Sequence, residues 1–225
     1  MALLFIGKIS KKEDWNLGIS VFFYKWFLYL YPYIIIGDEK GEPVMKMLAI
    51  NPISVKKRMI EFLFDYLFIL AYLVFLFIVS MLIYIIFFDG VPEFTEIQSQ
   101  WLVFFTSVLP ITLLFTYLDY AKDGSLGKGK AGLQLVYQKK TVQASLIRNI
   151  IKFLPWQLGH MGTIHGFYSN FDGLSIILSI SATLLAVVLL VMTMFRKDKR
   201  HLGDLLAHTQ VQLKEEEGRD CLSYP

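Results

Sequence analysis

The sequence predicts an all-α polytopic membrane protein with four transmembrane helices, at about residues 59–88, 101–118, 148–168 and 174–195. Of its 225 residues, 55% are hydrophobic and only 18% are charged, which is too apolar for an ordinary soluble domain. The 23 residues of 66–88 carry no charge. At about 1.5 Å rise per residue they reach about 34 Å as a helix, enough to cross a hydrocarbon core of about 30 Å.

Residues 1–50 form an N-terminal segment that is expected to lie at the membrane interface. Between Trp15 and Gly37 the chain is rich in aromatic residues, but Lys25 and Pro32 interrupt the apolar run. Aromatic rings settle in the headgroup layer, and a crossing here would strand the first lysines on the far side. We therefore expect an interfacial segment in preference to a fifth span.

The distribution of basic residues predicts a multi-pass protein of the cell membrane with both termini in the cytoplasm. Lys and Arg cluster at 56–58, before the first span, and at 196–200, after the last one, whereas the loop 89–100 contains three acidic residues and no basic one. The chain must then cross an even number of times, so 148–168 counts as a span although Pro155 and three glycines interrupt it. We expect this third span to be bent, tilted or partly unwound.

A short cytoplasmic β element is expected between the second and third spans. Over residues 133–138 apolar and mostly polar side chains alternate, which is typical of a strand or a hairpin. The four spans and this element make up one transmembrane domain, residues 51–213. A polar tail, residues 214–225, follows it.

The entrance of the first span carries the leading candidates for a functional site. Arg58 and Asp65 are seven positions apart, so two helical turns return them to nearly the same face. Glu61 lies between them on that face. Polar chemistry is therefore expected to meet the bilayer at this point.

The depth of Asp65 has two interpretations. Residues 66–88 can span the membrane unaided, which would place Asp65 in water at the boundary. If the preceding turn is also submerged, the carboxylate needs a positive partner, for which Arg58, Arg148 and Lys152 are candidates. A carboxylate sheltered in this way can bind and release a proton or a cation.

The second span offers Asp119 as a further candidate. Thr112, Thr116 and Asp119 fall on one helical face, and Pro110 cannot donate a hydrogen bond to the carbonyl of Thr106. These groups either line a hydrated crevice, or the threonines bond to their own helix and Asp119 sits in water.

Beyond the last span, Arg200 and Asp204 are one helical turn apart. They can form a local ion pair or reach across to Arg58 or Arg148. Such a network would either hold the cytoplasmic helix ends in register or act as a gate. Only burial would make it important for stability.

Several separated blocks occur in a fixed order: Arg58 with Asp65, Leu126-Gly127-Lys128 with Gly132-Leu133, then Arg148, then the stretch from Arg200 to Thr209. Over about residues 51–213 these blocks resemble the RDD family of membrane proteins, which is named for one arginine and two aspartates. The resemblance identifies Asp204 as the second aspartate, with Asp119 as the less favoured candidate. Gly203 and His208 stand where the family usually has His and Gly. The resemblance implies a membrane domain for which transport, including cation and proton exchange, or an accessory role has been suggested.

We therefore expect a protein that is not an enzyme and that carries out proton- or cation-coupled transport, with an accessory protein that regulates, inhibits or stabilises a partner as the alternative. The expected charge network or ion-binding site consists of Arg58, Glu61, Asp65, Asp119, Arg148, Arg200 and Asp204. No cofactor and no metal are expected, because the chain lacks phosphate-loop glycine spacing and clustered metal ligands. Anionic lipid headgroups beside the basic loops, further copies of the chain or another membrane protein are the expected partners, and nucleic acid is not.

Overall fold

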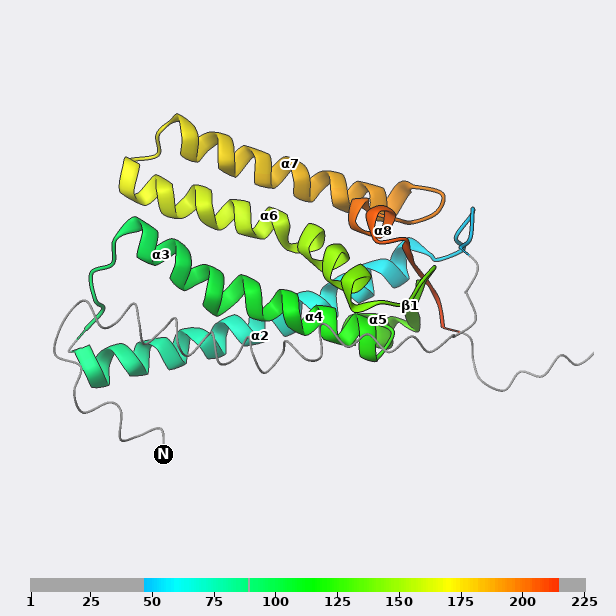
Figure 1. Cartoon of the computed structure of the whole chain (residues 1–225), viewed down its shortest axis with the longest axis horizontal. Helices are drawn as coiled ribbons and strands as arrows, with labels where there is room; N and C mark the ends of the chain where they lie inside the picture. The colour runs from blue at the N-terminus through cyan, green and yellow to red at the C-terminus, as the bar shows by residue number, and fades with distance from the viewer. Residues whose placement is uncertain (1–46, 89, 215–225) are drawn as a thin grey trace, which may run out of the picture. The chain divides into compact units, whose positions relative to one another are not determined.

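The computed structural model describes residues 47–88 and 90–214, which lie in one compact unit, Gly41–Pro225. The interfacial segment expected before residue 47 and the tail expected after residue 214 lie outside the described residues. The described elements in chain order are α2 (Val55–Phe88), α3 (Glu96–Val103), the π-helical segment η2 (Phe104–Val108), α4 (Leu109–Ala121), α5 (Leu126–Ala131), β1 (Leu133–Tyr137), α6 (Val142–Ser169), α7 (Gly173–Phe195), α8 (Leu202–Leu206) and β2 (Thr209–Leu213) (Figure 1).

Three helical stretches among the described residues are long and apolar enough to cross a membrane. They are α2, the run Glu96–Ala121 that joins α3, η2 and α4, and α7. The mostly helical architecture and these three stretches agree with the expected fold class. By length and composition, α6 is not among these candidate membrane spans.

Of the alternatives expected for the third span, which were a bent, tilted or partly unwound helix, partial unwinding is wrong, because α6 is one uninterrupted α-helix of 28 residues with Pro155 inside it. Proline removes a single backbone donor. Packing against α4 and α7 keeps the helix continuous across that position, and Figure 1 shows α6 and α7 running side by side. A Cβ at Gly162 of α6 would lie 2.6 Å from Ser179 Oγ of α7, so small residues permit this close approach.

Side-chain caps set the ends of the long helices. Thr95 and Gln98 form a capping box at the start of α3, and Thr141 accepts a hydrogen bond from the backbone N–H of Ala144 at the start of α6. Asp172, directly before α7, accepts a hydrogen bond from the backbone N–H of Ser175 at 3.0 Å and caps the start of that helix. Each cap satisfies a backbone donor that the first helical turn leaves free.

The second span departs from a regular α-helix around Pro110. The π-helical segment η2 directly precedes α4, in whose first turn this proline lies. The carbonyl of Thr106, to which Pro110 cannot donate, accepts a hydrogen bond of 2.5 Å from the hydroxyl of Tyr72 on α2. The free acceptor expected from the sequence therefore ties α2 to the second span.

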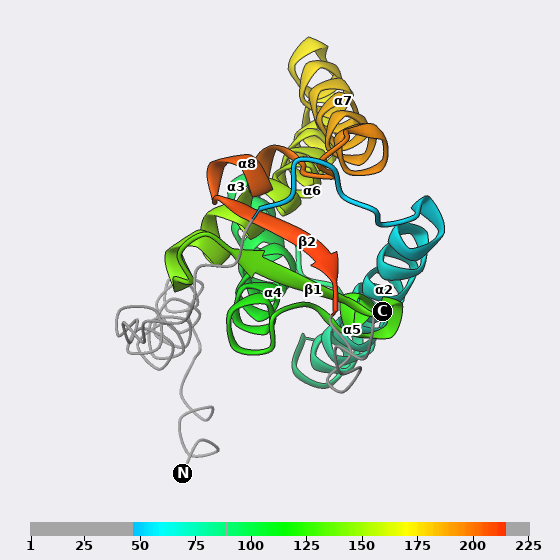
Figure 2. The same ribbon diagram turned by 90° about the vertical axis from the view of Figure 1, so that its right-hand side faces the viewer.

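The β element pairs two segments that are far apart in the sequence. β1 lies antiparallel to β2, with Leu133 opposite Leu213 and Tyr137 opposite Thr209. The expected strand is confirmed, and its partner comes from the C-terminal part of the chain (Figure 2). One hydrophobic core joins this pair to Ile53 and Ala131. The pairing brings the stretch before β2 next to the start of α6.

A second hydrophobic core joins three helices in the middle of the bundle. Phe115 of α4 and Phe153 of α6 stack edge to face, with ring centroids 5.2 Å apart. Phe68 of α2 meets Phe115 in the same way at 6.3 Å. No residue in the most apolar 18-residue stretch of α2 is buried among the described residues.

Candidate functional site

The first turns of α2 begin a buried charge network. Arg58, Glu61 and Asp65 are the buried residues of this helix, each no more than 4% exposed. Arg58 Nη1 donates to Glu61 Oε2 at 2.8 Å, and its Nη2 donates to the backbone carbonyl of Lys199 at 3.0 Å. The helical spacing predicted from the sequence thus places all three side chains on one inward face.

Asp65 is sheltered and partnered, so the interpretation that left it in water is wrong. The start of α5 covers it: Ser125 Oγ donates to Asp65 Oδ2 at 2.9 Å, and Gly127 N donates to Oδ1 at 3.0 Å. The positive partner is Lys152 of α6, whose Nζ lies 3.2 Å from Oδ2. Of the three candidate cations, Lys152 therefore pairs with Asp65.

Lys128 of α5 lies at the centre of the network and is fully buried. Its Nζ is 3.4 Å from Glu61 Oε1 on α2 and 3.3 Å from Asp119 Oδ1 on α4. It also donates to Ser125 Oγ at 3.3 Å. One ammonium group thereby joins three helices.

Arg148 of α6 carries the network from the second span to the C-terminal part of the chain. Its Nη1 donates to Asp119 Oδ2 and its Nε donates to Asp204 Oδ1, both at 2.6 Å. Asn149 Nδ2 also donates to Asp119 Oδ2, at 3.0 Å. Asp119 is fully buried, so the interpretation that placed it in water is wrong. Both candidate second aspartates thus share one arginine.

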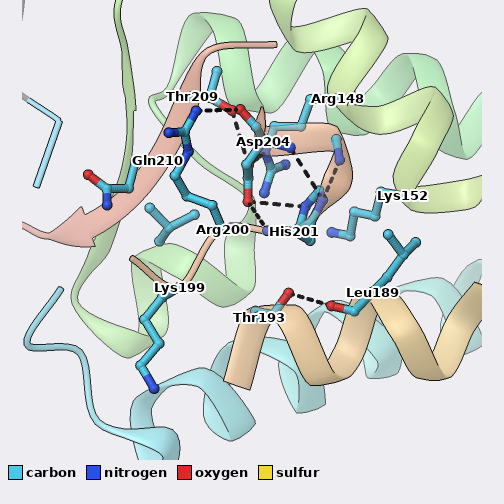
Figure 3. Close-up of polar contacts among 12 residues, drawn as sticks. Arg148, Lys152, Leu189, Thr193, Lys199, Arg200, His201, Asp204, Thr209 and Gln210 are labelled. Carbon is cyan, nitrogen blue, oxygen red and sulfur yellow. Dashed lines mark hydrogen bonds and ion pairs between the residues drawn. The ribbon is translucent and has the colours of Figure 1, made fainter. Parts of the chain in front are cut away.

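Asp204 is fixed by the short helix α8 and by the strand that follows it. Its Oδ2 accepts from the backbone N–H of His201, while His201 Nδ1 accepts from the backbone N–H of Gly203 and Asp204, which makes a reciprocal cap. Thr209 Oγ1 donates to Asp204 Oδ1 at 3.0 Å. Figure 3 shows Asp204 among Arg148, His201 and Thr209.

Burial acts on the titration of both ends of this cap. It lowers the pKa of the His201 imidazole to about 4, although the charge of Asp204 raises it, so the ring is neutral at pH 7. Burial raises the pKa of the Asp204 carboxyl, but His201 when protonated and the nearby Arg148 outweigh it and hold that pKa well below its usual range. Because Nδ1 of the neutral ring accepts two hydrogen bonds, its proton lies on Nε2.

Acid should weaken the fold through His201. In the unfolded chain this ring binds a proton near pH 6.5, and in the folded chain only near pH 4. The unfolded state therefore binds more protons within this window, so stability falls as the pH is lowered from 6.5, by about 3 kcal/mol at pH 4. Unfolding of the wild type and of His201→Asn in detergent at several pH values measures this. Asparagine keeps the cap without titrating, so equal pH slopes for the two proteins would contradict the expectation.

Within the described residues, the positive and negative side chains of the network are balanced. The cations are Arg58, Lys128, Arg148 and Lys152, and the carboxylates are Glu61, Asp65, Asp119 and Asp204. Four charges of each sign leave no excess negative charge to hold a resident cation. A cation that enters must therefore displace one of these positive groups or the proton it carries.

A cavity of about 740 Å³ reaches the network from between α2, α6 and α7. Its polar end is formed by Arg58, Glu61, Arg148, Lys152 and His201. Its remaining wall is largely apolar and includes Trp156 and Ala186. The volume lies within the range of about 300–1,000 Å³ that is usual for ligand sites. Lys152 lines this cavity, so a molecule or ion that occupies it can contact the Lys152 side chain.

The structure joins most of the residues expected from the sequence. Arg200 is the exception: its guanidinium donates to the backbone carbonyl of Asp204 at 3.1 Å and does not pair with the carboxylate. The hydroxyls of Thr112 and Thr116 donate to the backbone carbonyls four residues earlier. The threonines thus bond to their own helix, as in the interpretation that was the alternative to a hydrated crevice. Sequence reasoning missed the role of Lys128, although the residue stands in the block Leu126-Gly127-Lys128.

Metal ligation finds no support in this region. Among residues 47–88 and 90–214, no group of three or more His, Cys, Asp or Glu side chains is placed to hold a metal ion. His160 and His165 both lie on α6. His165 contacts the carboxylates of Glu96 and Asp172 at 2.7 and 3.3 Å.

Long apolar helices around a buried cluster of ionisable groups define this chain as a membrane protein. The model of the RDD family matches residues 52–208. The chain belongs to the RDD family, and the resemblance stated from the sequence is confirmed. All eight charged residues of the network lie within the matched region. No curated protein and no solved structure matches the chain significantly.

Proposed function

We propose that this RDD family protein mediates proton- or cation-coupled transport, with the Asp65–Lys152 pair as the site of exchange. The proposal includes four spans in the cell membrane with both termini in the cytoplasm. In support of four, α6 has 28 residues and packs along α7, and a helix of that length reaches about 42 Å. The basic residues beside α2 and α7 favour a cytoplasmic location for the strand pair.

The position of Lys152 carries the proposal. Its side chain is 17% exposed and lines the cavity, whereas the side chains of the other three cations are no more than 2% exposed. The ammonium nitrogen of Lys152 also lies 3.2 Å from Oδ2 of Asp65. It therefore occupies the place at which an incoming cation would meet the carboxylate.

Charge balance sets the stoichiometry of the proposed exchange. If a monovalent cation bound to Asp65 while Lys152 stayed charged in place, the buried network would carry an uncompensated positive charge, which is costly at low dielectric. Lys152 must then release a proton or swing into the cavity. In the first case, which is the exchange proposed, one proton is released for each monovalent cation bound, whereas a Lys152 that moves away still charged releases none.

Flux measurements on purified protein in proteoliposomes test the proposal. Asp65→Asn should abolish cation-driven proton movement, because the amide can still accept from Gly127 N but cannot neutralise a cation. Asp123→Asn is the matched control, since Asp123 pairs with Lys140 at 2.8 Å and its side chain is 50% exposed. Wild-type flux in Asp65→Asn would overturn the proposal. Retained size-exclusion behaviour of both variants shows that they fold.

The exposed surface of α2 favours a second candidate, an accessory role toward another membrane protein. No residue in the most apolar stretch of this helix is buried, and Phe75 and Phe77 are both more than 60% exposed. Lipid, a second copy or a partner helix can cover this surface. Under this function, wild-type proteoliposomes show no flux, and a specific membrane protein co-purifies in mild detergent in a way that polar substitutions at Phe75 and Phe77 abolish.

A further inference from the structure

The cavity between α2, α6 and α7 has two chemically different halves. Arg58, Lys152 and His201 contribute to the end that meets the charge network. Toward the middle of the helices the wall contains Trp156, Ala186 and other residues that are mostly apolar. This distribution matches a molecule with a polar head and an apolar tail.

Two buried nitrogen atoms at the polar end have no hydrogen-bond partner among the described residues. They are Nε of Arg58 and Nε2 of His201. The two residues are 2% and 7% exposed. The Nε2 atom lies 3.3 Å from Asp204 Oδ2, but without hydrogen-bond geometry. Both atoms are N–H donors, because a guanidinium has no acceptor and the neutral ring of His201 carries its proton on Nε2. Buried donors without partners are costly, and both residues line the cavity.

The charges that line the cavity define the head. Three cations, Arg58, Arg148 and Lys152, and one carboxylate, Glu61, line this end, and the histidine is neutral. The other carboxylates that pair with these cations, Asp65, Asp119 and Asp204, do not line the cavity. Together with two N–H donors, this arrangement favours an oxyanion such as a phosphate ester. A cationic or zwitterionic head would gain less from the same surface.

We propose that this cavity binds one anionic phospholipid, with its phosphate at Arg58, Lys152 and His201 and an acyl chain along Trp156 and Ala186. A free phosphate would leave the apolar half without an occupant. That half lies between two helices apolar enough to cross a membrane, so its natural occupant is a chain from the bilayer. The inference goes beyond the proposed transport, because it concerns occupancy of the cavity and holds whether or not an ion moves.

Quenching of Trp156 by brominated acyl chains tests the binding without a transport assay. Trp15, Trp26 and Trp101 are replaced by Phe in the full chain, which leaves Trp156 as the reporter. Nanodiscs of phosphatidylcholine receive increasing fractions of either brominated phosphatidylglycerol or brominated phosphatidylcholine. One charge-assisted hydrogen bond corresponds to about a tenfold preference, so half-maximal quenching should require about tenfold less of the anionic lipid.

Two substitutions on α7 separate the cavity from the general lipid surface. Ala186→Phe fills the apolar half and should remove the preference for the anionic lipid. Val188→Phe adds the same ring on another face of the helix, where Val188 is 50% exposed and does not line the cavity, and should leave the preference unchanged.

The possible outcomes are distinct. Equal quenching by the two lipids, or a preference that survives Ala186→Phe, would overturn the proposal. Inorganic phosphate at millimolar concentration should not relieve the quenching. If it does so fully, the site binds a free anion and the lipid assignment is wrong. Because no flux is measured, failure of the transport proposal would leave this result unaffected.

Discussion

Arg148→Met is expected to cost about 3–5 kcal/mol of unfolding free energy, because it leaves buried carboxylates without their shared cation. Arg148 donates to Asp119 and to Asp204 at 2.6 Å each, and all three side chains are no more than 2% exposed. A buried ion pair adds little to stability compared with apolar residues, but removal of one partner strands the other charge. Denaturant unfolding in mild detergent, followed by helical circular dichroism, measures the loss.

Two further variants make the Arg148 result specific. Arg196→Gln breaks an ion pair to Asp198 at 2.9 Å in which the arginine side chain is 41% exposed, so it should cost less than about 1 kcal/mol. Adding Asp119→Asn and Asp204→Asn to Arg148→Met should recover a large part of the stability, since the stranded charges are removed with the arginine. Equal losses for Arg148→Met and Arg196→Gln would show that the network does not hold the fold.

Gly127→Ala is expected to destabilise the protein by about 3 kcal/mol or more, through a clash with backbone that cannot move aside. A Cβ at Gly127 would lie 2.2 Å from the carbonyl oxygen of Glu61 and 2.6 Å from Asp65 Oδ1. Helix α5 would have to lift away from α2, which would also break the hydrogen bond from Gly127 N to Asp65. The same unfolding assay measures the effect, and the variant should also lower the yield of folded protein.

Gly129→Ala is the matched control on the same short helix. A Cβ at Gly129 has no heavy atom within 4 Å, so the added methyl group meets no obstacle. Alanine favours helix over glycine by about 1 kcal/mol, so this variant should be neutral or slightly more stable. If both glycine variants behaved alike, close contact between α5 and α2 would not be what holds Asp65.

Local patterns predicted the parts of the fold that depend on local chemistry. The charge-free run 66–88 forms most of α2, and the alternation over 133–138 forms β1. The partner of β1 could not be predicted, because β2 lies more than seventy residues further along the chain and hydrogen bonding between strands leaves no local signature. The partial unwinding considered for α6 does not occur at Pro155, since a single missing donor does not unwind a helix that is packed against its neighbours.

The candidate site was predictable as a set of residues but not as a set of pairs. The sequence spacing predicted that Arg58 lies near Asp65. In the structure Arg58 forms an ion pair with Glu61, and Lys152 forms one with Asp65. Which cation pairs with which carboxylate depends on how α5 packs against α2 and on where Lys128 then lies, beside Glu61. The residue spacing within α2 contains no information on this packing. Pairing of this kind follows from tertiary geometry alone.

The strand pair also sets an order of events during synthesis. Arg148 and β1 emerge from the ribosome well before Asp204 and β2, which supply the last hydrogen-bonded strand and the last carboxylate of the cluster. Until residues 209–213 have been made, the arginine has only one of its two acids and the strand edge stays open. Among the described elements, α8 and β2 are therefore the last to join the charge network and the strand pair.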